Sequence, residues 1–204
     1  MIKLEKYKLF SKRYIARGLV EEYVEREDIE EGWISYIVDL LQIPIYLILS
    51  IPCRLPICSH LMEIISRIWE RGRFGFFLRA TYYRTKLGSI GQNVFIDQNA
   101  SLFGCKNIFI GHDSHIDTGV VLICGDGKLS IGSYCHIANN VVINGKPFVN
   151  IGDYTAIAAG AKIYGSTTKP TAKCMSPMAP LFMTETIEIG IDIGENALVG
   201  LNTV

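Results

Sequence analysis

Three of the four histidines lie in the second half of the chain, at His112, His115 and His136. An imidazole titrates near neutral pH and can remove or donate a proton during a reaction. His60 lies in an apolar N-terminal stretch, where an interfacial role is the better interpretation. The sequence therefore directs the search for acid–base chemistry to the second half.

A repeat positions these histidines. The dipeptide Ile-Gly recurs at spacings of 20, 21, 20 and 42 residues, at Ile90, Ile110, Ile131, Ile151 and Ile193. Within the intervals aliphatic residues recur every six positions, as at Ile131, Ile137 and Ile143. Three such hexads make one triangular coil, and stacked coils place parallel strands about 4.8 Å apart. The sequence predicts a mainly β fold, a parallel β-helix of five coils, because a β-sandwich would not hold a six-residue register.

The register also predicts which residues stack. His115 and His136 are each the sixth residue counted from an Ile-Gly isoleucine in successive coils. We therefore expect the two rings to lie one above the other on the same corner, one strand spacing apart. Phe95 precedes them in this ladder and Ala156 follows. The residue before each ladder position is small or β-branched, as Ser114 is, which suits a tight inward corner.

The phrases IGSYCHIANNVVING and IGDYTAIAAGAKIYGS, with a loop that ends SPMAP, resemble hexapeptide-repeat acyltransferases. The resemblance covers residues 79–204 and is closest to the branch that acetylates nucleotide-linked amino sugars or growing surface polysaccharides. It implies a left-handed β-helix, acetyl-CoA or another acyl-CoA as the donor, and no metal. It also implies a homotrimer with active sites between neighbouring β-helices, and a sugar or lipid-linked glycan as the acceptor.

The predicted catalytic set is His136, His115 and Asp117. His136, in CHIAN, matches the histidine that the resembling enzymes use as the base. Asp117 follows the His115 corner and is placed to hydrogen-bond the His136 ring one coil away; the alternative is a plain turn residue. Asn139 and Asn140 are candidates to hold sugar hydroxyls or polarise the thioester, unless they only form corners.

A loop excursion over residues 165–186 accounts for the long spacing before Ile193. Long loops in compact repeats usually serve function, and we expect this one to reach the neighbouring subunit's cleft. Lys169 and Lys173 are candidates to bind phosphates of CoA or a nucleotide sugar, or else are solvated surface lysines. The maltose, galactoside and xenobiotic branches carry their histidine near the start of such a loop. This chain has none there, which favours His136.

Val204 falls in mid-coil, so we expect either further coils or another cover over that end, and a CoA site that is incomplete in these residues. Two alternatives to the transferase follow. One is a catalytically inactive or truncated β-helix that serves as an assembly module. The other is a zinc hydratase of the γ-carbonic-anhydrase type, with three histidines around the metal.

Residues 1–86 are predicted to form a helical region with an apolar segment over 33–62. The stretch LLQIPIYLILSIPC is shorter than a bilayer requires, and its prolines are expected to break a helix. Downstream, Arg67, Arg71, Arg73, Arg79, Arg84 and Lys86 alternate with aromatic residues, which suits an anionic headgroup layer. We expect a monotopic or re-entrant membrane contact on the cytoplasmic face. The alternatives are a helical pair packed on the second domain, a true span, or a protein interface.

The composition excludes several classes of protein. The 204 residues carry 20 basic and 20 acidic side chains, so the chain lacks the basic surplus of a nucleic-acid binder. Its six cysteines show neither CxxC pairs nor the density of a secreted scaffold, which indicates reduced thiols and a cytoplasmic protein. No cleavable signal peptide, Walker lysine loop, GxSxG elbow or dinucleotide fingerprint is visible.

Overall fold

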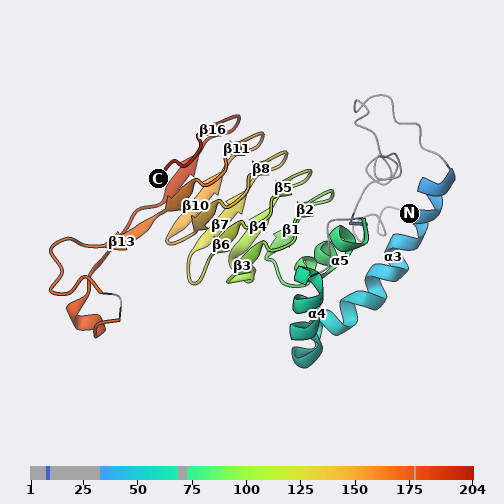
Figure 1. Cartoon of the computed structure of the whole chain (residues 1–204), viewed down its shortest axis with the longest axis horizontal. Helices are drawn as coiled ribbons and strands as arrows, with labels where there is room; N and C mark the ends of the chain where they lie inside the picture. The colour runs from blue at the N-terminus through green and yellow to red at the C-terminus, as the bar shows by residue number, and fades with distance from the viewer. Residues whose placement is uncertain (1–7, 10–32, 69–72, 177) are drawn as a thin grey trace.

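The computed structural model describes residues 8–9, 33–68, 73–176 and 178–204. Three helices come first: α3 (Trp33–Arg54), α4 (Pro56–Ile68) and α5 (Arg73–Arg84). From Ser89 onward the described chain is a solenoid of short strands, and the helices lie at the end of the solenoid that carries its first coil (Figure 1).

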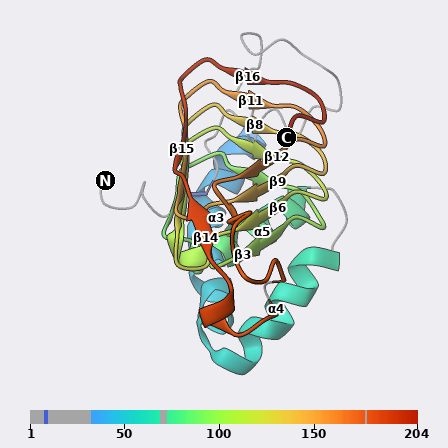
Figure 2. The same cartoon turned by 90° about the vertical axis from the view of Figure 1, so that its left-hand side faces the viewer.

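The solenoid has three parallel sheets, which give it the triangular outline seen along its axis (Figure 2). Sheet A holds β1 (Ser89–Ile90), β4 (Ile108–Ile110), β7 (Lys128–Ile131), β10 (Phe148–Ile151) and β15 (Ile191–Ile193). Sheet B holds β2 (Phe95–Ile96), β5 (His115–Ile116), β8 (His136–Ile137), β11 (Ala156–Ile157) and β16 (Leu198–Val199). Sheet C holds β3 (Ser101–Phe103), β6 (Val121–Ile123), β9 (Val142–Asn144) and β12 (Lys162–Tyr164). The predicted parallel β-helix is confirmed.

The core consists of the aliphatic positions of the hexads. Ile137 pairs with Ile116 on one side and Ile157 on the other, and all three are fully buried. The small residues before the ladder positions are buried too, as Ser114 and Thr155 show. Each coil thus adds one more layer of the same side chains, which explains why the six-residue register extends along the whole solenoid.

Two corners of each coil have a left-handed backbone, and glycine and asparagine occupy the one between sheets B and C. Between sheets B and C the residues with positive φ are Asn99, Gly119, Asn140, Gly160 and Asn202. Glycine and asparagine adopt this conformation at the lowest cost. At Gly119 a Cβ atom would also lie 2.3 Å from the side-chain oxygen of Asn140 in the next coil. This corner therefore fixes both the residue type and the stacking.

An arm leaves the solenoid after β12 and returns before β15. Its base is the antiparallel pair β13 (Ser166–Thr168) and β14 (Thr186–Glu188), and its outer part holds the 3₁₀ turn η2 (Leu181–Met183). A second 3₁₀ turn, η1 (Cys105–Asn107), joins β3 to β4. Lys146 Nζ lies 3.1 Å from Glu188 and 3.2 Å from Asp126, which ties the base of the arm to the solenoid.

Helix α5 covers the first coil. Tyr82, Tyr83 and Leu87 join the aliphatic core, and the Tyr83 hydroxyl donates to the Ala100 carbonyl. The guanidinium of Arg79 is fully buried and donates to the carbonyl of Ile96. These contacts cover the edges of the first strands, which have no preceding coil to pair with.

The expectation that prolines break a helix in this region was wrong. Pro44 and Pro52 do not break α3, which runs for 22 residues. Contacts with α4 and α5 stabilise this long helix enough to outweigh the backbone hydrogen bonds that the prolines remove. By length and composition, Ile37–Arg54 is able to cross a membrane.

Three of the basic and aromatic residues expected to meet headgroups are buried in the structure. Arg79, Tyr82 and Tyr83 face the solenoid instead of solvent, because their side chains fill the gap over the first coil. Arg84 is partly buried, and this burial lowers the pKa of its guanidinium. The expected side-chain roles of Arg67, Arg71 and Arg73 lie outside the described residues.

Candidate active site

His115 and His136 form the predicted ladder. They are direct partners in β5 and β8, and their ring centroids lie 5.7 Å apart with a tilt of 31°. Phe95 is the partner of His115 in the preceding coil, and Ala156 is the partner of His136 in the next. The stack follows from the register, because the same hexad position in two coils faces the same way.

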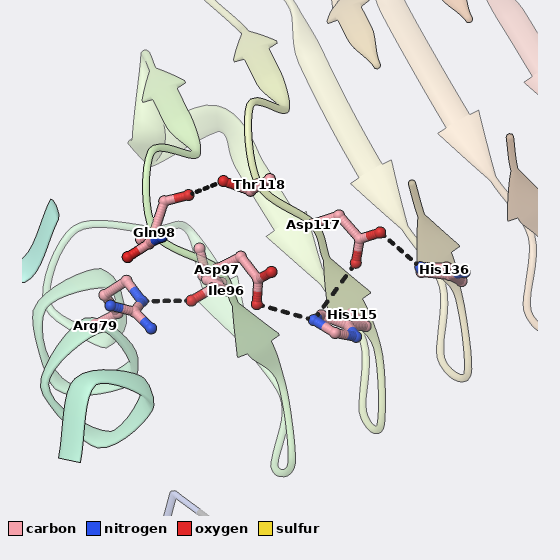
Figure 3. A network of polar contacts seen from close by, with 8 residues as sticks. All are labelled: Arg79, Ile96, Asp97, Gln98, His115, Asp117, Thr118 and His136. Atoms are coloured by element: carbon pink, nitrogen blue, oxygen red, sulfur yellow. Dashed lines mark hydrogen bonds and ion pairs between the residues drawn. The ribbon is translucent and has the colours of Figure 1, made fainter. Parts of the chain in front are cut away.

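Asp117 links the two rings. Its Oδ2 atom lies 3.1 Å from His136 Nε2, and its Oδ1 atom lies 3.5 Å from His115 Nε2 (Figure 3). The Asp117 side chain is 13% exposed, against 53% for His136, so the carboxylate is recessed beneath the rings. The predicted contact between Asp117 and the next coil's histidine is present.

A second carboxylate supports His115 from the other side. Asp97 Oδ1 lies 3.1 Å from His115 Nε2, and the Asp97 side chain is 2% exposed. The sequence analysis missed Asp97, although the signal was present. Asp97 follows Ile96 as Asp117 follows Ile116, so both occupy one hexad position in successive coils. In the next coil that position is Ala138, and the acidic ladder ends there.

Aromatic rings close the N-terminal side of the ladder. Phe76 of α5 and Phe95 of β2 contact the His115 ring edge-on, with centroids 6.4 and 6.0 Å away. Arg79 of α5 fixes the strand through the Ile96 carbonyl (Figure 3). His115 is therefore enclosed by protein on one side, whereas His136 stands at the open end of the ladder.

The hydrogen bonds define which ring nitrogen can act as a base. An ionised carboxylate only accepts hydrogen bonds, so the Nε2 atoms that face Asp97 and Asp117 carry the ring protons. The Nδ1 atom of a neutral ring then holds the free lone pair. A carboxylate behind an imidazole also orients the ring and stabilises its protonated form. His136, which Asp117 contacts, is the more exposed of the two rings, at 53% against 43% for His115.

The other predicted residues are not gathered here. Asn140 has a left-handed backbone and its side chain lies over Gly119, while the carbonyl of Asn139 accepts the Gly160 N–H. Both asparagines thus serve the corner between sheets B and C. That corner begins two residues after Ile137, beyond the strand that carries His136.

The arm lysines lie in a third place. Lys169 Nζ donates to Glu185 at 2.8 Å across the arm, and Lys173 is exposed further out. The arm departs from the corner between sheets C and A, whereas the histidine ladder lies in sheet B. Within one chain, therefore, the arm based on β13 lies apart from the sheet B strands β5 and β8 that carry the histidines (Figure 1).

His112 is also separate from the ladder. Its Nδ1 atom accepts the backbone N–H of Gln92 at 3.2 Å, and it lines an open groove of about 680 Å³ over sheet A with Phe109 and Arg84.

The ligand atoms of His115, Asp117 and His136 lie within 4.8 Å of one another, close enough to hold a metal ion. That group contains two histidines, so the arrangement differs from the three-histidine site of the zinc alternative.

Comparisons with known proteins support the expected resemblance of the solenoid to acyltransferases. No family model matches the chain. Over 117 residues the chain is 36% identical to a dTDP-4-amino-4,6-dideoxy-D-glucose acyltransferase from Escherichia coli, a match that covers 57% of this chain and 61% of the relative. The expected resemblance to sugar acyltransferases is confirmed. The chain spans about three fifths of the length of that relative.

Solved structures agree with this likeness. The N-acyltransferase AntD from Bacillus cereus, in complex with dTDP and 3-hydroxybutyryl-CoA, is 25% identical with a TM-score of 0.54. The match covers 58% of this chain and 63% of AntD. A complex of AntD with dTDP and coenzyme A gives 25% identity and a TM-score of 0.53, over 57% and 62% of the two chains. The solenoid is therefore similar in structure to an N-acyltransferase that was solved with coenzyme A or an acyl-CoA.

Proposed function

We propose that the protein is an acyl-CoA-dependent acyltransferase that acts on the amino group of a nucleotide-linked sugar, with His136 as the general base. The hydrogen-bonded cluster of His115, Asp117 and His136 carries the proposal. Support comes from the solenoid that carries this cluster, which is similar to a dTDP-4-amino-4,6-dideoxy-D-glucose acyltransferase and to AntD in complex with dTDP-4-amino-4,6-dideoxyglucose and coenzyme A. An acetyl group is the simplest acyl group for such a donor.

The proposed reaction uses the free Nδ1 atom of His136. The acceptor nitrogen attacks the thioester carbonyl, and a C–N bond forms while His136 takes one proton from that nitrogen. The tetrahedral intermediate then collapses and its C–S bond breaks. The proton passes from His136 to the departing sulfur, so the products are an amide and free CoA. Asp117 stabilises the imidazolium that exists between the two proton transfers.

The site of a single chain is open on one side, since the His136 side chain is more than half exposed. We propose a homotrimer in which a neighbouring copy supplies the missing wall. In that assembly the arm is positioned to bring Lys169 and Lys173 to the phosphates of CoA or the nucleotide, and Asn139 and Asn140 lie at the rim. Light scattering of the purified chain tests the trimer, and a monomer at assay concentration would contradict it.

An acylated nucleotide sugar is an activated donor for glycosyl transfer. We therefore propose that the product enters cell-surface polysaccharide, after a glycosyltransferase moves the acylated sugar to a growing glycan. Transfer to a hydroxyl of a lipid-linked glycan is the competing acceptor. Incubation with each acceptor class separates the two.

The test combines binding and turnover on the full chain. Acetyl-CoA and dTDP-4-amino-4,6-dideoxyglucose are supplied together, and the acylated sugar nucleotide is followed by mass spectrometry. We expect His136→Ala to bind acetyl-CoA as the wild type does but to turn over about 10²–10⁴-fold more slowly, as for loss of a general base. His112→Ala is the matched control and should retain activity.

Two results would contradict the proposal. Undiminished turnover by His136→Ala would remove the base assignment. A folded wild type that binds neither acetyl-CoA nor the sugar nucleotide in calorimetry would favour the assembly module.

A further inference from the structure

Helix α3 has its polar and apolar faces reversed relative to a helix on a soluble domain. Its buried face carries Asp39, Gln42, Tyr46, Ser50 and Cys53, spaced three or four residues apart. Its outward face is aliphatic and comprises Ile37, Val38, Leu40, Leu41, Ile45, Leu47, Ile48 and Ile51. A water-exposed helix normally shows the opposite pattern, with apolar residues inward.

The polar face is held in place by specific hydrogen bonds. Lys8 Nζ donates to Asp39 at 2.8 Å, and the N–H of Leu9 donates to the Gln42 side chain at 3.0 Å. Gln42 also donates to Asp39 at 3.0 Å. Rotating α3 to bury its aliphatic face would break this network and leave buried polar groups without partners. The outward aliphatic face is therefore a fixed feature of the fold.

The exposed face continues onto α4. Ile57 is 89% exposed, and Leu61 and Ile64 follow it at helical spacing. Helices α3 and α4 pack against each other and are joined at Leu55, and their exposed aliphatic residues are together called here the α3–α4 face. Solvent-exposed apolar patches of this extent mark an interaction site.

We infer that the α3–α4 face rests on a lipid bilayer. Protein-binding sites concentrate aromatic and arginine anchors, whereas the exposed residues of this face are isoleucine, leucine and valine. No charged residue lies between Asp39 and Arg54, so a long stretch of α3 meets an apolar solvent without desolvating a charge. Arg54, exposed where α3 ends, is placed to reach the headgroups while its stem stays in the apolar layer.

The contact is monotopic and not a span. The face of α3 opposite to the lipid packs on α4 and α5 and carries an aspartate, so lipid cannot surround the helix. Only the outward half of each helix enters the acyl region, as in interfacial amphipathic helices. This inference is independent of the proposed function, because it uses no residue of the histidine ladder.

Vesicle flotation of the full chain tests the inference. We expect the wild type to float with phosphatidylcholine vesicles, and with vesicles that also contain phosphatidylglycerol, even at raised salt, because aliphatic burial carries the contact. The triple variant Leu40→Glu, Ile48→Glu and Ile57→Glu changes only outward side chains. It should lower the partition coefficient at least about tenfold, since burying even one such aliphatic side chain contributes that much.

The matched control places three glutamates at apolar positions equally exposed but far from the helices, Met178, Phe182 and Leu201. This control should float as the wild type does, and circular dichroism should show that both variants are folded. The inference is overturned if the wild type stays with the soluble fraction. It is also overturned if binding disappears at raised salt, or if the helix variant floats normally but loses an oligomer, which would make the face a protein interface.

Discussion

Asp117→Asn separates the carboxylate's charge from its shape. Asparagine keeps the size of the side chain and one acceptor oxygen, but it removes the negative charge that faces both imidazoles. Asp117 lies 3.1 Å from His136 and 3.5 Å from His115, so the shorter contact dominates. If His136 becomes an imidazolium during turnover, the variant stabilises that state less well.

The expected magnitude follows from the contact and its exposure. A hydrogen bond to a charged group contributes about 1.5–3 kcal/mol, which is about ten- to hundredfold in rate. The His136 side chain is 53% exposed, and water screens part of this contribution, so we expect a fall in kcat of about tenfold. The KM for acetyl-CoA should stay near the wild-type value, because Asp117 supports the ring and does not touch the donor.

The assay is steady-state release of CoA with saturating dTDP-4-amino-4,6-dideoxyglucose. Asp192→Asn is the matched control, since Asp192 is an exposed aspartate of sheet A that accepts a hydrogen bond from Asn150. It should leave kcat unchanged. A kcat for Asp117→Asn within twofold of the wild type would refute the claim that the carboxylate supports the base.

Three further predictions concern stability and reactivity. Ile137→Ala deletes a fully buried side chain in the sheet B ladder and should lower the free energy of unfolding by about 2–5 kcal/mol; urea denaturation measures it, and an unchanged midpoint would contradict the layered core. Burial raises the pKa of the Cys124 and Cys135 thiols, so at neutral pH both should resist iodoacetamide in the folded protein and react after denaturation; rapid labelling of the native state, seen by mass spectrometry, would count against this. Lys146 holds the pKa of Asp126 below its usual range, so this carboxyl adds stability above its unfolded pKa of about 4 and loses it as the pH falls through the lower folded value. Lys146→Met should therefore be less stable than the wild type near neutral pH and approach it in acid; a difference in melting temperature that does not change between these pH values would be the opposite result.

The solenoid was predictable because its rule is local. Each hexad places one aliphatic residue inward and one small residue before the next face, and every coil repeats the rule in the same direction. The stack of His115 on His136 followed from position in the hexad alone. Asp97 was equally predictable, since it repeats Asp117 one coil earlier and contacts His115 from that side.

The helical region was less predictable because no repeat constrains it. In the sequence, the basic and aromatic neighbours of Arg79 favour a contact with headgroups, yet tertiary packing buries its side chain against the Ile96 carbonyl. Proline usually breaks a helix. Here the free energy lost with the missing backbone hydrogen bond is smaller than that gained from packing a 22-residue helix. The sequence does not predict that Asp39 faces inward, because that position depends on its ion pair with Lys8.

The histidine ladder limits where a coil can be added to the solenoid without separating His115 from His136. Both imidazoles occupy the same position of consecutive coils, so duplicating a coil of 20 or 21 residues after β9 would lengthen the protein and leave the pair intact. Inserting a coil without a ladder histidine between β6 and β7 would instead place His115 and His136 two strand spacings apart, about 10 Å, beyond the reach of one carboxylate. The solenoid can therefore grow freely toward its C-terminal coils, whereas the two coils that share Asp117 must remain neighbours.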